Sequence, residues 1–334
     1  MNDNTALGFL KRAGVAGNGA VLLGSSVACD AHAERPVRIV THAHSDHIVG
    51  LAKSIDACEI VLMTPATRDI LKFLRSKRAL LSPKVRALSY MTPFHYNGET
   101  ITLYEASHIP GSAQVAVHTE DDIRIIYTGD FKLPGSPILP ADILVIEATY
   151  GSPAHVRGFE QMVEAEFISL IEQSVTRLPV FIMGYHGKLQ QVLQLLGRAR
   201  IGVPVILQEK VYLVARALEK HGLLFDEYAL ASADGLQSEE PFVALFHAMT
   251  KREFPRRAVK VFLSGWQFSN PIRATGPNEY TVALSGHSDF RGLMEYVEKS
   301  KPKFVITDGY RSRNAKALAA QIQSRLGIPA KAMP

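Results

Sequence analysis

The sequence predicts a layered α/β fold, and three observations support this. Short apolar runs with strand character alternate with longer segments of helical periodicity, and several of these runs end in loops rich in His, Asp and Gly. The chain has 334 residues, 47% of them apolar and 21% charged, which suffices for one large or two modest domains with a sizeable core. This composition excludes a disordered chain. Because no uncharged apolar run reaches about 20 residues, no segment is expected to span a membrane.

The elements follow from local patterns. Short uninterrupted apolar runs predict buried strands, here Ala20–Leu23, Ser26–Cys29, Val37–Thr41, Ile60–Met63, Ile123–Tyr127 and Ile143–Ile146. Apolar residues spaced by three and four predict amphipathic helices, here Pro65–Lys77, Phe159–Arg177, Lys188–Arg200, Lys210–His221, Phe290–Lys299 and Asn314–Leu326. The segment 14–29 superficially resembles a secretory signal, but Asn18 and Gly19 interrupt its apolar region, so two strands are the preferred interpretation.

The middle of the chain is expected to form a unit of its own. Val180–Met183, Pro204–Leu207 and Val259–Leu263 are short apolar strands separated by helices, and nothing resembles a flexible linker. This pattern predicts a cassette at 152–282 inserted into a larger domain formed by 1–151 and completed by 283–334.

Charge and cysteine content narrow the class of protein. Lys and Arg number 37 against 32 Asp and Glu, a net charge of +5 that suits a polyanionic partner without proving one. The two cysteines, Cys29 and Cys58, cannot build a disulfide framework or a four-thiolate zinc site, so a reducing cytoplasm is the expected compartment.

The segment following the strand Val37–Thr41 is the most informative one. It contains four side chains of metal-ligand type within six residues, namely His42, His44, Asp46 and His47. In an extended loop, residues i and i+2 point the same way, so His42 and His44 can hold one metal ion. Asp46 and His47, at the start of the next helix, can face a second ion.

The pattern His-x-His-x-Asp-His after a buried strand resembles the signature of the metallo-β-lactamase superfamily. Further segments match in the family's order: Asp30 resembles the aspartate that supports the ligand loop, His108 resembles the third ligand, and Asp130 resembles the bridging aspartate. The resemblance implies an αββα sandwich and two divalent metal ions, with Zn²⁺ preferred and Mn²⁺ as the alternative. A carboxylate between two cations suits two-metal hydrolysis.

Two later segments narrow the resemblance to the β-CASP nucleases. Glu147 lies in a segment similar to their first special motif, and His287 lies in one similar to their second, in which a histidine is proposed to protonate the leaving oxygen. The segments around Lys188 and around Ser264 and Trp266 are similar to the family's inserted cassette, especially in the ligase-associated exonucleases. The likeness covers nearly the whole chain after about residue 20, and its motifs are specific only jointly.

One position departs from the family. Where the RNA-processing members carry the histidine of the third special motif, this chain has Asp308. An oxygen ligand there would shift preference towards harder cations such as Mn²⁺. Alternatively, Asp308 only caps the next turn and the second metal site is weak.

The resemblance implies a division of roles. One ion would be held by His42, His44 and His108, and the other by Asp46, His47 and Asp308, with Asp130 bridging. The catalytic group would consist of Asp46, Asp130, His287 and Glu147, in which His287 is the general acid and Glu147 orients it.

The expected substrate is nucleic acid. Basic residues cluster at 68–86 and at 251–257, although solvated helix faces explain such clusters equally well. Lys188 at an apparent helix start suits a phosphate, and Trp266, together with Ser264, lies in the cassette motif where bases can stack, although such aromatic residues often only line a core or cleft.

The leading hypothesis is a DNA exonuclease acting on single-stranded or processed ends, with a homodimer or DNA-repair and ligase proteins as candidate partners and no membrane. The alternatives are a ribonuclease of the messenger-RNA 3′-end processing or ribonuclease J type, a small-molecule metallohydrolase, and a non-catalytic nucleic-acid-binding subunit.

Overall fold

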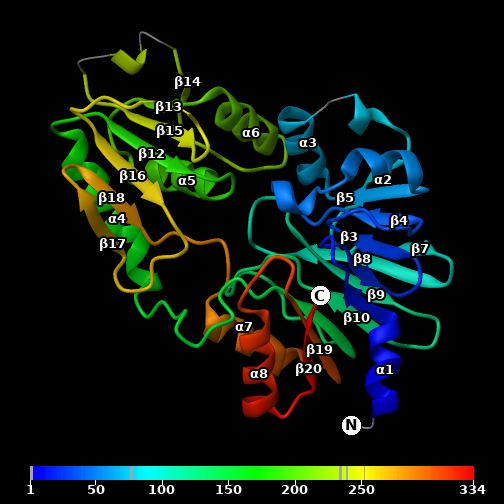
Figure 1. The fold of residues 1–334 in the computed structure, drawn as a ribbon. Helices are drawn as coiled ribbons and strands as arrows, with labels where there is room; N and C mark the ends of the chain where they lie inside the picture. Colours follow the sequence, from blue (N-terminus) through cyan, green and yellow to red (C-terminus); the bar gives the residue numbers. More distant parts are fainter. Residues whose placement is uncertain (1–2, 76–77, 233–234, 238–239, 252) are drawn as a thin grey trace. The chain divides into compact units, whose positions relative to one another are not determined.

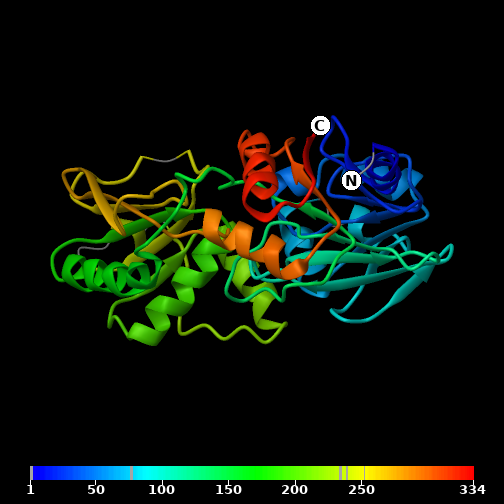
Figure 2. The same ribbon diagram turned by 90° about the horizontal axis from the view of Figure 1, so that it is seen from below.

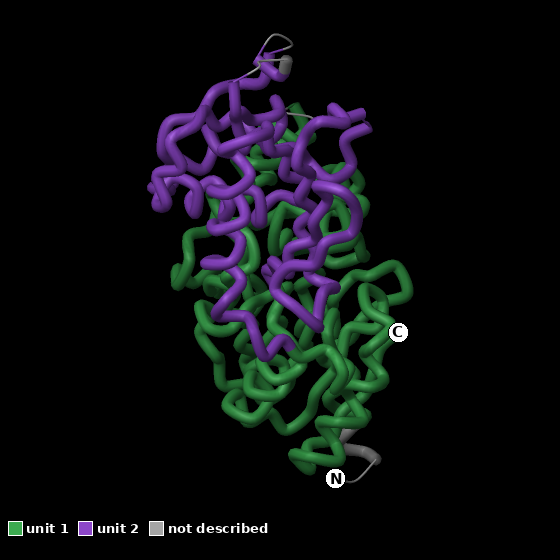
Figure 3. The backbone as a smooth tube through the Cα atoms, turned by 90° about the vertical axis from the view of Figure 1, so that its left-hand side faces the viewer, with its two compact units in different colours: residues 1–156, 287–334 green, residues 157–286 purple. Residues whose placement is uncertain are grey.

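The computed structural model describes the chain except residues 1–2, 76–77, 233–234, 238–239 and 252. The chain forms two compact units (Figure 3): residues 1–156 with 287–334 make up unit 1, and residues 157–286 make up unit 2. Among the described helices, none combines the length and the apolar character that crossing a bilayer requires.

Unit 1 contains two sheets (Figure 1). The first has six strands whose spatial order equals their chain order: β1 (Ala13–Val15), β2 (Val21–Leu23), β3 (Val27–Cys29), β4 (Val37–Ile39), β5 (Ile60–Met63) and β6 (Val85–Ala87). The second has seven, in the spatial order β20 (Ala330–Met333), β19 (Phe304–Asp308), β11 (Ile143–Ile146), β10 (Arg124–Tyr127), β9 (Ala113–His118), β8 (Glu99–Glu105) and β7 (Phe94–Tyr96).

The core of unit 1 follows from the alternation of side chains along its strands. In β11, Ile143 and Val145 belong to the cluster that also contains Val27 and Ile39 of the first sheet, so the two sheets pack face to face. The intervening Leu144 and Ile146 pack with the helices α7 (Phe290–Ser300) and α8 (Ala315–Leu326), which lie side by side on the other face (Figure 2).

Shorter helices accompany the first sheet. They are α1 (Asp3–Arg12), α2 (Leu51–Ala57) and α3 (Pro65–Leu74), with 3₁₀ turns at Ser45–His47 and Ala79–Leu81. α3 begins where local chemistry predicts, because the Thr64 hydroxyl accepts from the Thr67 N–H at 3.2 Å and Pro65 occupies the first helical position.

Unit 2 is a seven-stranded, mostly parallel sheet with helices. Its spatial order is β14 (Ala229–Leu230), β13 (Val205–Leu207), β15 (Val243–His247), β12 (Val180–Gly184), β16 (Val259–Leu263), β18 (Glu279–Val282) and β17 (Ile272–Gly276). α4 (Val163–Val175), α5 (Lys188–Ala199) and α6 (Glu209–Glu219) share one apolar cluster with the sheet, and 3₁₀ turns lie at Glu160–Met162 and Gly235–Gln237. The sheet's other face carries a second cluster around Phe181 and Phe246.

The α/β class is confirmed, and so are most of the predicted elements. One expectation was wrong: no α-helix begins at Asp46 and His47, because Ser45–His47 forms a 3₁₀ turn and Gly50 adopts a left-handed conformation (φ +66°) before α2 starts at Leu51. The helix expected over 159–177 starts only at Val163, and the one expected to reach Lys77 ends at Leu74, with Lys77 itself outside the described residues. The hairpin β8–β9 was not predicted, although the alternating burial of Glu99–Glu105 is a strand signal.

This topology places several loops at one edge of unit 1. β4 runs parallel to β3 and β5, and β10, β11 and β19 run parallel to one another. The carboxyl ends of parallel strands meet at one edge, where ligand-binding loops commonly gather. The segments after β4, β10 and β11 carry the ligand loop, Asp130 and Glu147, and Asp308 is the last residue of β19. His108 follows β8, and His287 precedes α7.

Candidate functional site

Three histidine rings converge in unit 1. Nε2 of His42 and Nε2 of His108 each lie 3.1 Å from Nδ1 of His44. A single Nδ1 cannot form complementary hydrogen bonds with both neighbours unless it shares one proton or lone pair between them. In tetrahedral zinc sites, with Zn–N bonds of about 2.0–2.1 Å, ligand nitrogens stand roughly 3.3 Å apart. The three rings are therefore spaced as ligands of one metal ion.

Asp130 lies at the centre of the cluster, on the loop that follows β10. Its Oδ2 atom is 3.3 Å from Nε2 of His47 and 3.7 Å from Nε2 of both His42 and His108. Ligand atoms of His42, His44, His108 and Asp130 all lie within 4.8 Å of one another. One carboxylate oxygen thus faces imidazole nitrogens from two separate loops.

His47 supplies a test of whether the residues fit a metal ion. Its ring is fully buried, and its Nε2 atom has no hydrogen-bond partner among the described residues. That atom faces two carboxylates, since Asp46 Oδ2 lies at 3.5 Å and Asp130 Oδ2 at 3.3 Å. A buried nitrogen between two carboxylates is the donor set of a cation site. The residues therefore fit divalent metal ions at both positions.

Asp30 holds the other side of the His47 ring. Its carboxylate accepts from Nδ1 of His47 at 2.8 Å, from the Thr41 N–H and hydroxyl at 2.9 Å, and from the Tyr127 hydroxyl at 2.9 Å. With Nδ1–H donated to Asp30, Nε2 points towards Asp130. Asp30 is itself in a left-handed conformation (φ +64°) and fully buried.

The charges of these groups are mutually dependent. Burial, reinforced by the neighbouring histidines, holds the pKa of His42 well below its usual range. Burial acts against the charge of Asp130, but His47 and His287 overcome it and hold its pKa well below the usual value. Burial likewise opposes protonation of His47, yet Asp130 and Asp30 raise its pKa to about 10. A metal ion would displace the His47 proton, as metal binding does at ligating histidines.

His287 and Glu147 form a pair beside this cluster. Nδ1 of His287 lies 3.1 and 3.0 Å from the two carboxylate oxygens of Glu147, and its Nε2 lies 4.0 Å from Asp130 Oδ2. Glu147 is itself oriented by the Phe131 N–H, which donates to it at 3.0 Å. Nε2 of His287 is therefore directed at the cluster.

No family model matches the chain. An uncharacterised protein encoded in the lig 3′ region of Acidianus ambivalens is 36% identical over 138 residues, 41% of this chain and 99% of that protein. A probable DNA ligase of Opitutus terrae is 26% identical over 86% of this chain and 28% of its own length. The cleavage and polyadenylation specificity factor subunit 3 of Dictyostelium discoideum is 28% identical over 54% of this chain and 27% of its own length.

The chain belongs to the β-CASP family of the metallo-β-lactamase superfamily. It spans only about a quarter of the length of the ligase and of the polyadenylation subunit. A solved structure of an Enterococcus faecalis protein of unknown function has a TM-score of 0.64 at 14% identity, covering 89% of this chain and 79% of that one, and shows a shared fold.

In this β-CASP chain, Asp308 is not placed with the other predicted ligands. Among the described residues, two groups could hold a metal ion, His42, His44, His108 and Asp130 on the one hand and Asp130, Glu147 and His287 on the other, and Asp308 lies outside both, as do Asp46 and His47. Its carboxylate is 2% exposed and pairs with the guanidinium of Arg311 at 2.8 Å. It also accepts from the backbone N–H groups of Tyr310 and Arg311. These contacts agree with the second interpretation of the sequence, in which Asp308 caps the following turn and does not bind a metal ion.

The predicted substrate residues lie in unit 2. Lys188 is the first residue of α5, and Gln190 bonds back to the Gly187 N–H at 2.7 Å, closing the helix start. Ser264 and Trp266 follow β16, whose neighbour β12 leads into α5, so both loops leave the same edge of the parallel sheet. The side chain of Trp266 is 61% exposed.

Sequence reasoning missed four residues of the site. Thr41 and Tyr127 bind Asp30, Arg311 binds Asp308, and the buried Arg38 donates to the His47 carbonyl at 3.3 Å. Arg38 carried a readable signal, because a charged residue within an apolar strand needs buried partners. The hydroxyl groups of Thr41 and Tyr127 carried none, since such side chains are common in strands.

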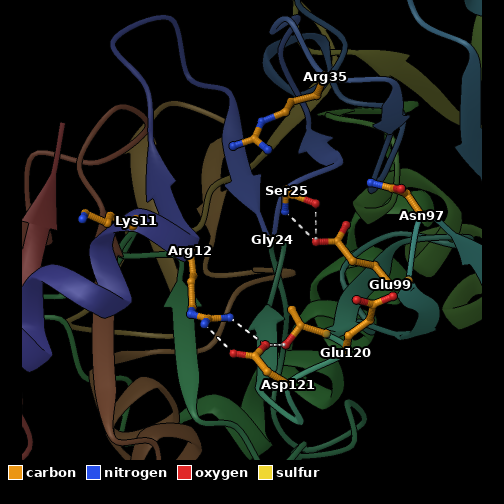
Figure 4. A pocket seen from close by; sticks show the side chains of 11 residues that line it. Lys11, Arg12, Gly24, Ser25, Arg35, Asn97, Glu99, Glu120 and Asp121 are labelled. Atoms are coloured by element: carbon orange, nitrogen blue, oxygen red, sulfur yellow. Dashed lines mark hydrogen bonds and ion pairs between the residues drawn. The ribbon is translucent and has the colours of Figure 1, made fainter.

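A cavity of about 390 Å³ lies in unit 1, where it is lined by the β2–β3 turn at Gly24 and Ser25 and by the start of β8 at Glu99 (Figure 4). Its walls contain an ion pair between Arg12 and Asp121, and Glu99 accepts from the backbone N–H groups of Ser25 and Ser26. These contacts join the end of α1 to the turn at Asp121, and the β2–β3 turn to the start of β8.

Proposed function

We propose that this β-CASP chain is a nuclease that hydrolyses phosphodiester bonds with two divalent metal ions. One observation carries the proposal: imidazole nitrogens of His42, His47, His108 and His287 lie 3.3–4.0 Å from a single oxygen of Asp130. Four imidazole nitrogens around one buried carboxylate oxygen suit a carboxylate that would bridge two metal ions held by those histidines.

For the fold, we propose a metallo-β-lactamase domain with an inserted β-CASP cassette, as expected for such a nuclease. Unit 1, with two facing sheets and α7 and α8 on an outer face, supports the αββα sandwich of the metallo-β-lactamase domain. Unit 2, with its own parallel sheet, supports the inserted β-CASP cassette expected at 152–282.

The first ion would be held by His42, His44, His108 and Asp130. The second would be held by Asp46, His47 and Asp130. Zn²⁺ and Mn²⁺ both suit such nitrogen and oxygen donors. When bound, the ions activate water and neutralise the charge of the phosphodiester.

The chain's own residues do the remaining work. Asp30 keeps His47 in the tautomer whose Nε2 faces the second ion's position. Glu147 fixes the ring of His287, so that a proton on Nε2 is directed at the cluster, where the leaving oxygen would depart. Asp130 remains ionised under the influence of the histidines around it.

For the substrate we propose DNA ends, with exonucleolytic action. The relative named as a probable DNA ligase aligns with 86% of this chain, which supports a role connected with DNA. The polyadenylation subunit of Dictyostelium supports the second candidate, a ribonuclease. In both cases Lys188, Ser264 and Trp266 are the proposed nucleic-acid contacts.

The test is a time course with matched 5′-phosphorylated single-stranded DNA and RNA oligomers, each internally labelled, in Mn²⁺ or Zn²⁺. We expect DNA to shorten progressively while RNA is spared. Cleavage of RNA instead would assign the ribonuclease function. Cleavage of neither oligomer would contradict the proposal and return attention to a small-molecule hydrolase or a non-catalytic subunit.

A further inference from the structure

Both carboxylate oxygens of Asp308 accept hydrogen bonds from groups of unit 1. One of its carboxylate oxygens accepts from the backbone N–H groups of Tyr310 and Arg311 at 3.0 and 3.3 Å, and the other accepts from the Arg311 guanidinium at 2.8 Å. Both oxygens therefore have donors already. A cation could bind Asp308 only by competing with Arg311.

Arg311 is itself held in place from three sides. Besides Asp308, its guanidinium donates to the carbonyl of Gly19 at 2.9 Å and to the carbonyl of Asp46 at 3.2 Å. Its side chain is only 9% exposed. The contact with Asp46 places the guanidinium on the backbone of a residue whose carboxylate faces His47.

The turn that carries Arg311 is packed tightly against the β1–β2 turn. Gly19 has φ +85°, and a Cβ at that position would lie 2.4 Å from the ring of Tyr310. The Arg311 guanidinium also stacks over the Tyr310 ring, with 5.7 Å to its centroid. A shift of Arg311 would therefore break contacts with two distant segments at once.

We propose that Arg311 is a positioning residue that withholds Asp308 from the second metal position, so that the two ions bind with unequal affinity. This inference rests on the proposed metal centre. The first position has three imidazoles and Asp130. The second has Asp46, His47 and a share of Asp130.

Two physical effects weaken the second position. Asp308 is lost as an anionic ligand, and the fixed positive charge of Arg311 lies beside the Asp46 backbone, where it repels a second cation. Changes in groups that surround metal ligands alter metal affinity by about 10–100-fold. The second ion is therefore expected to bind at least about 10-fold more weakly than the first.

The experiment is a titration of chelator-treated protein with Mn²⁺, in which electron paramagnetic resonance measures the free ion. The wild-type chain should show one tight and one weaker class of site. Asp308→Asn should not tighten the weaker class, because Asp308 is not a ligand and the Arg311 charge loses its counter-charge. Arg311→Gln should tighten the weaker class by about 10-fold or more, since it frees Asp308 and removes the repulsive charge.

Arg313→Gln is the matched control, because it removes one exposed arginine from the same loop and should change neither class. Thermal unfolding of each variant verifies that it is folded, and if Arg311→Gln does not fold, the ratio of the two wild-type affinities still decides. An Arg311→Gln protein whose weaker class is not tightened, or two equal classes in the wild-type chain, would overturn the inference while leaving the metal centre intact. Absence of any Mn²⁺ binding would refute the proposed metal centre itself.

Discussion

Both carboxylate oxygens of Glu147 lie within hydrogen-bonding distance of Nδ1 of His287, at 3.1 and 3.0 Å. Glu147 is 4% exposed and bound by the Phe131 N–H, so its carboxylate is a fixed acceptor. The ring of His287 therefore cannot rotate freely. Its Nε2 lies 4.0 Å from Asp130 Oδ2, and we propose that His287 acts as a general acid, separately from the metal ligands.

Replacing His287 by alanine tests that separation. Loss of a positioned general acid typically slows turnover by about 10²–10⁴-fold. We expect a decrease in kcat of that order, while the metal content, measured by elemental analysis, stays at the wild-type level. Glu147→Gln should retain part of the activity and alter its pH profile. A His287→Ala protein that has lost its metal would show that His287 is a ligand.

Asp130→Asn should have a larger effect. An amide oxygen bears no net charge, so the neighbouring histidines lose the carboxylate they share and the metal ions lose a bridging ligand. We expect nuclease activity to disappear and metal affinity to fall by more than about 100-fold, beyond the effect of a change outside the ligands. Asp122→Asn is the control, because the Asp122 side chain is 93% exposed. Full activity of Asp130→Asn would refute the two-metal mechanism.

Tyr127→Phe tests the support of the ligand loop. The Tyr127 hydroxyl donates to Asp30 at 2.9 Å in a fully buried position, and its loss leaves a buried carboxylate with one donor fewer. The expected decrease in the free energy of unfolding is about 1–3 kcal/mol, measured by urea denaturation. Tyr104→Phe, at a half-buried position of β8, should have a smaller effect. Equal effects of the two substitutions would contradict the assigned role of Tyr127.

Asp142 should make the stability of unit 1 depend on pH. Burial opposes its charge, but the Arg124 N–H and Lys303, which lie at 2.9 and 3.0 Å, overcome this and lower its pKa. A carboxyl group with a lowered pKa in the folded state stabilises the fold above its unfolded pKa of about 3.9, and this contribution is lost as the pH falls through the lowered value.

The measurement compares wild-type and Asp142→Asn protein in urea after chelator treatment, so that metal release does not contribute. The wild-type chain should be more stable by about 1–3 kcal/mol at neutral pH. The difference should shrink as the pH falls below about 3.9, the unfolded pKa of an aspartate. A difference that is constant with pH would show that the Asp142 charge contributes nothing.

Much of the candidate site was predictable because it is encoded locally. His42 and His44 are two positions apart in an extended loop, so their spacing indicates a shared direction, and Asp46 and His47 follow directly in the chain. The strands β5 and β11 were predicted with their observed bounds, because apolar runs bounded by polar loops have few other solutions. The hairpin β8–β9 was missed, since its pairing depends on contacts between segments rather than on an apolar run.

The sequence by itself determined the family, the ligand loop and the pairing of Glu147 with His287, because these follow from motifs in a known order. Only the tertiary structure showed that the carboxylate of Asp308 binds the guanidinium of Arg311. Its partner Arg311 is three residues away, but Arg311 is anchored by the carbonyl groups of Gly19 and Asp46, which are 292 and 265 positions distant. A carboxylate at the end of a strand can bind a metal ion or a guanidinium, and the choice depends on which charge the folded chain brings to it.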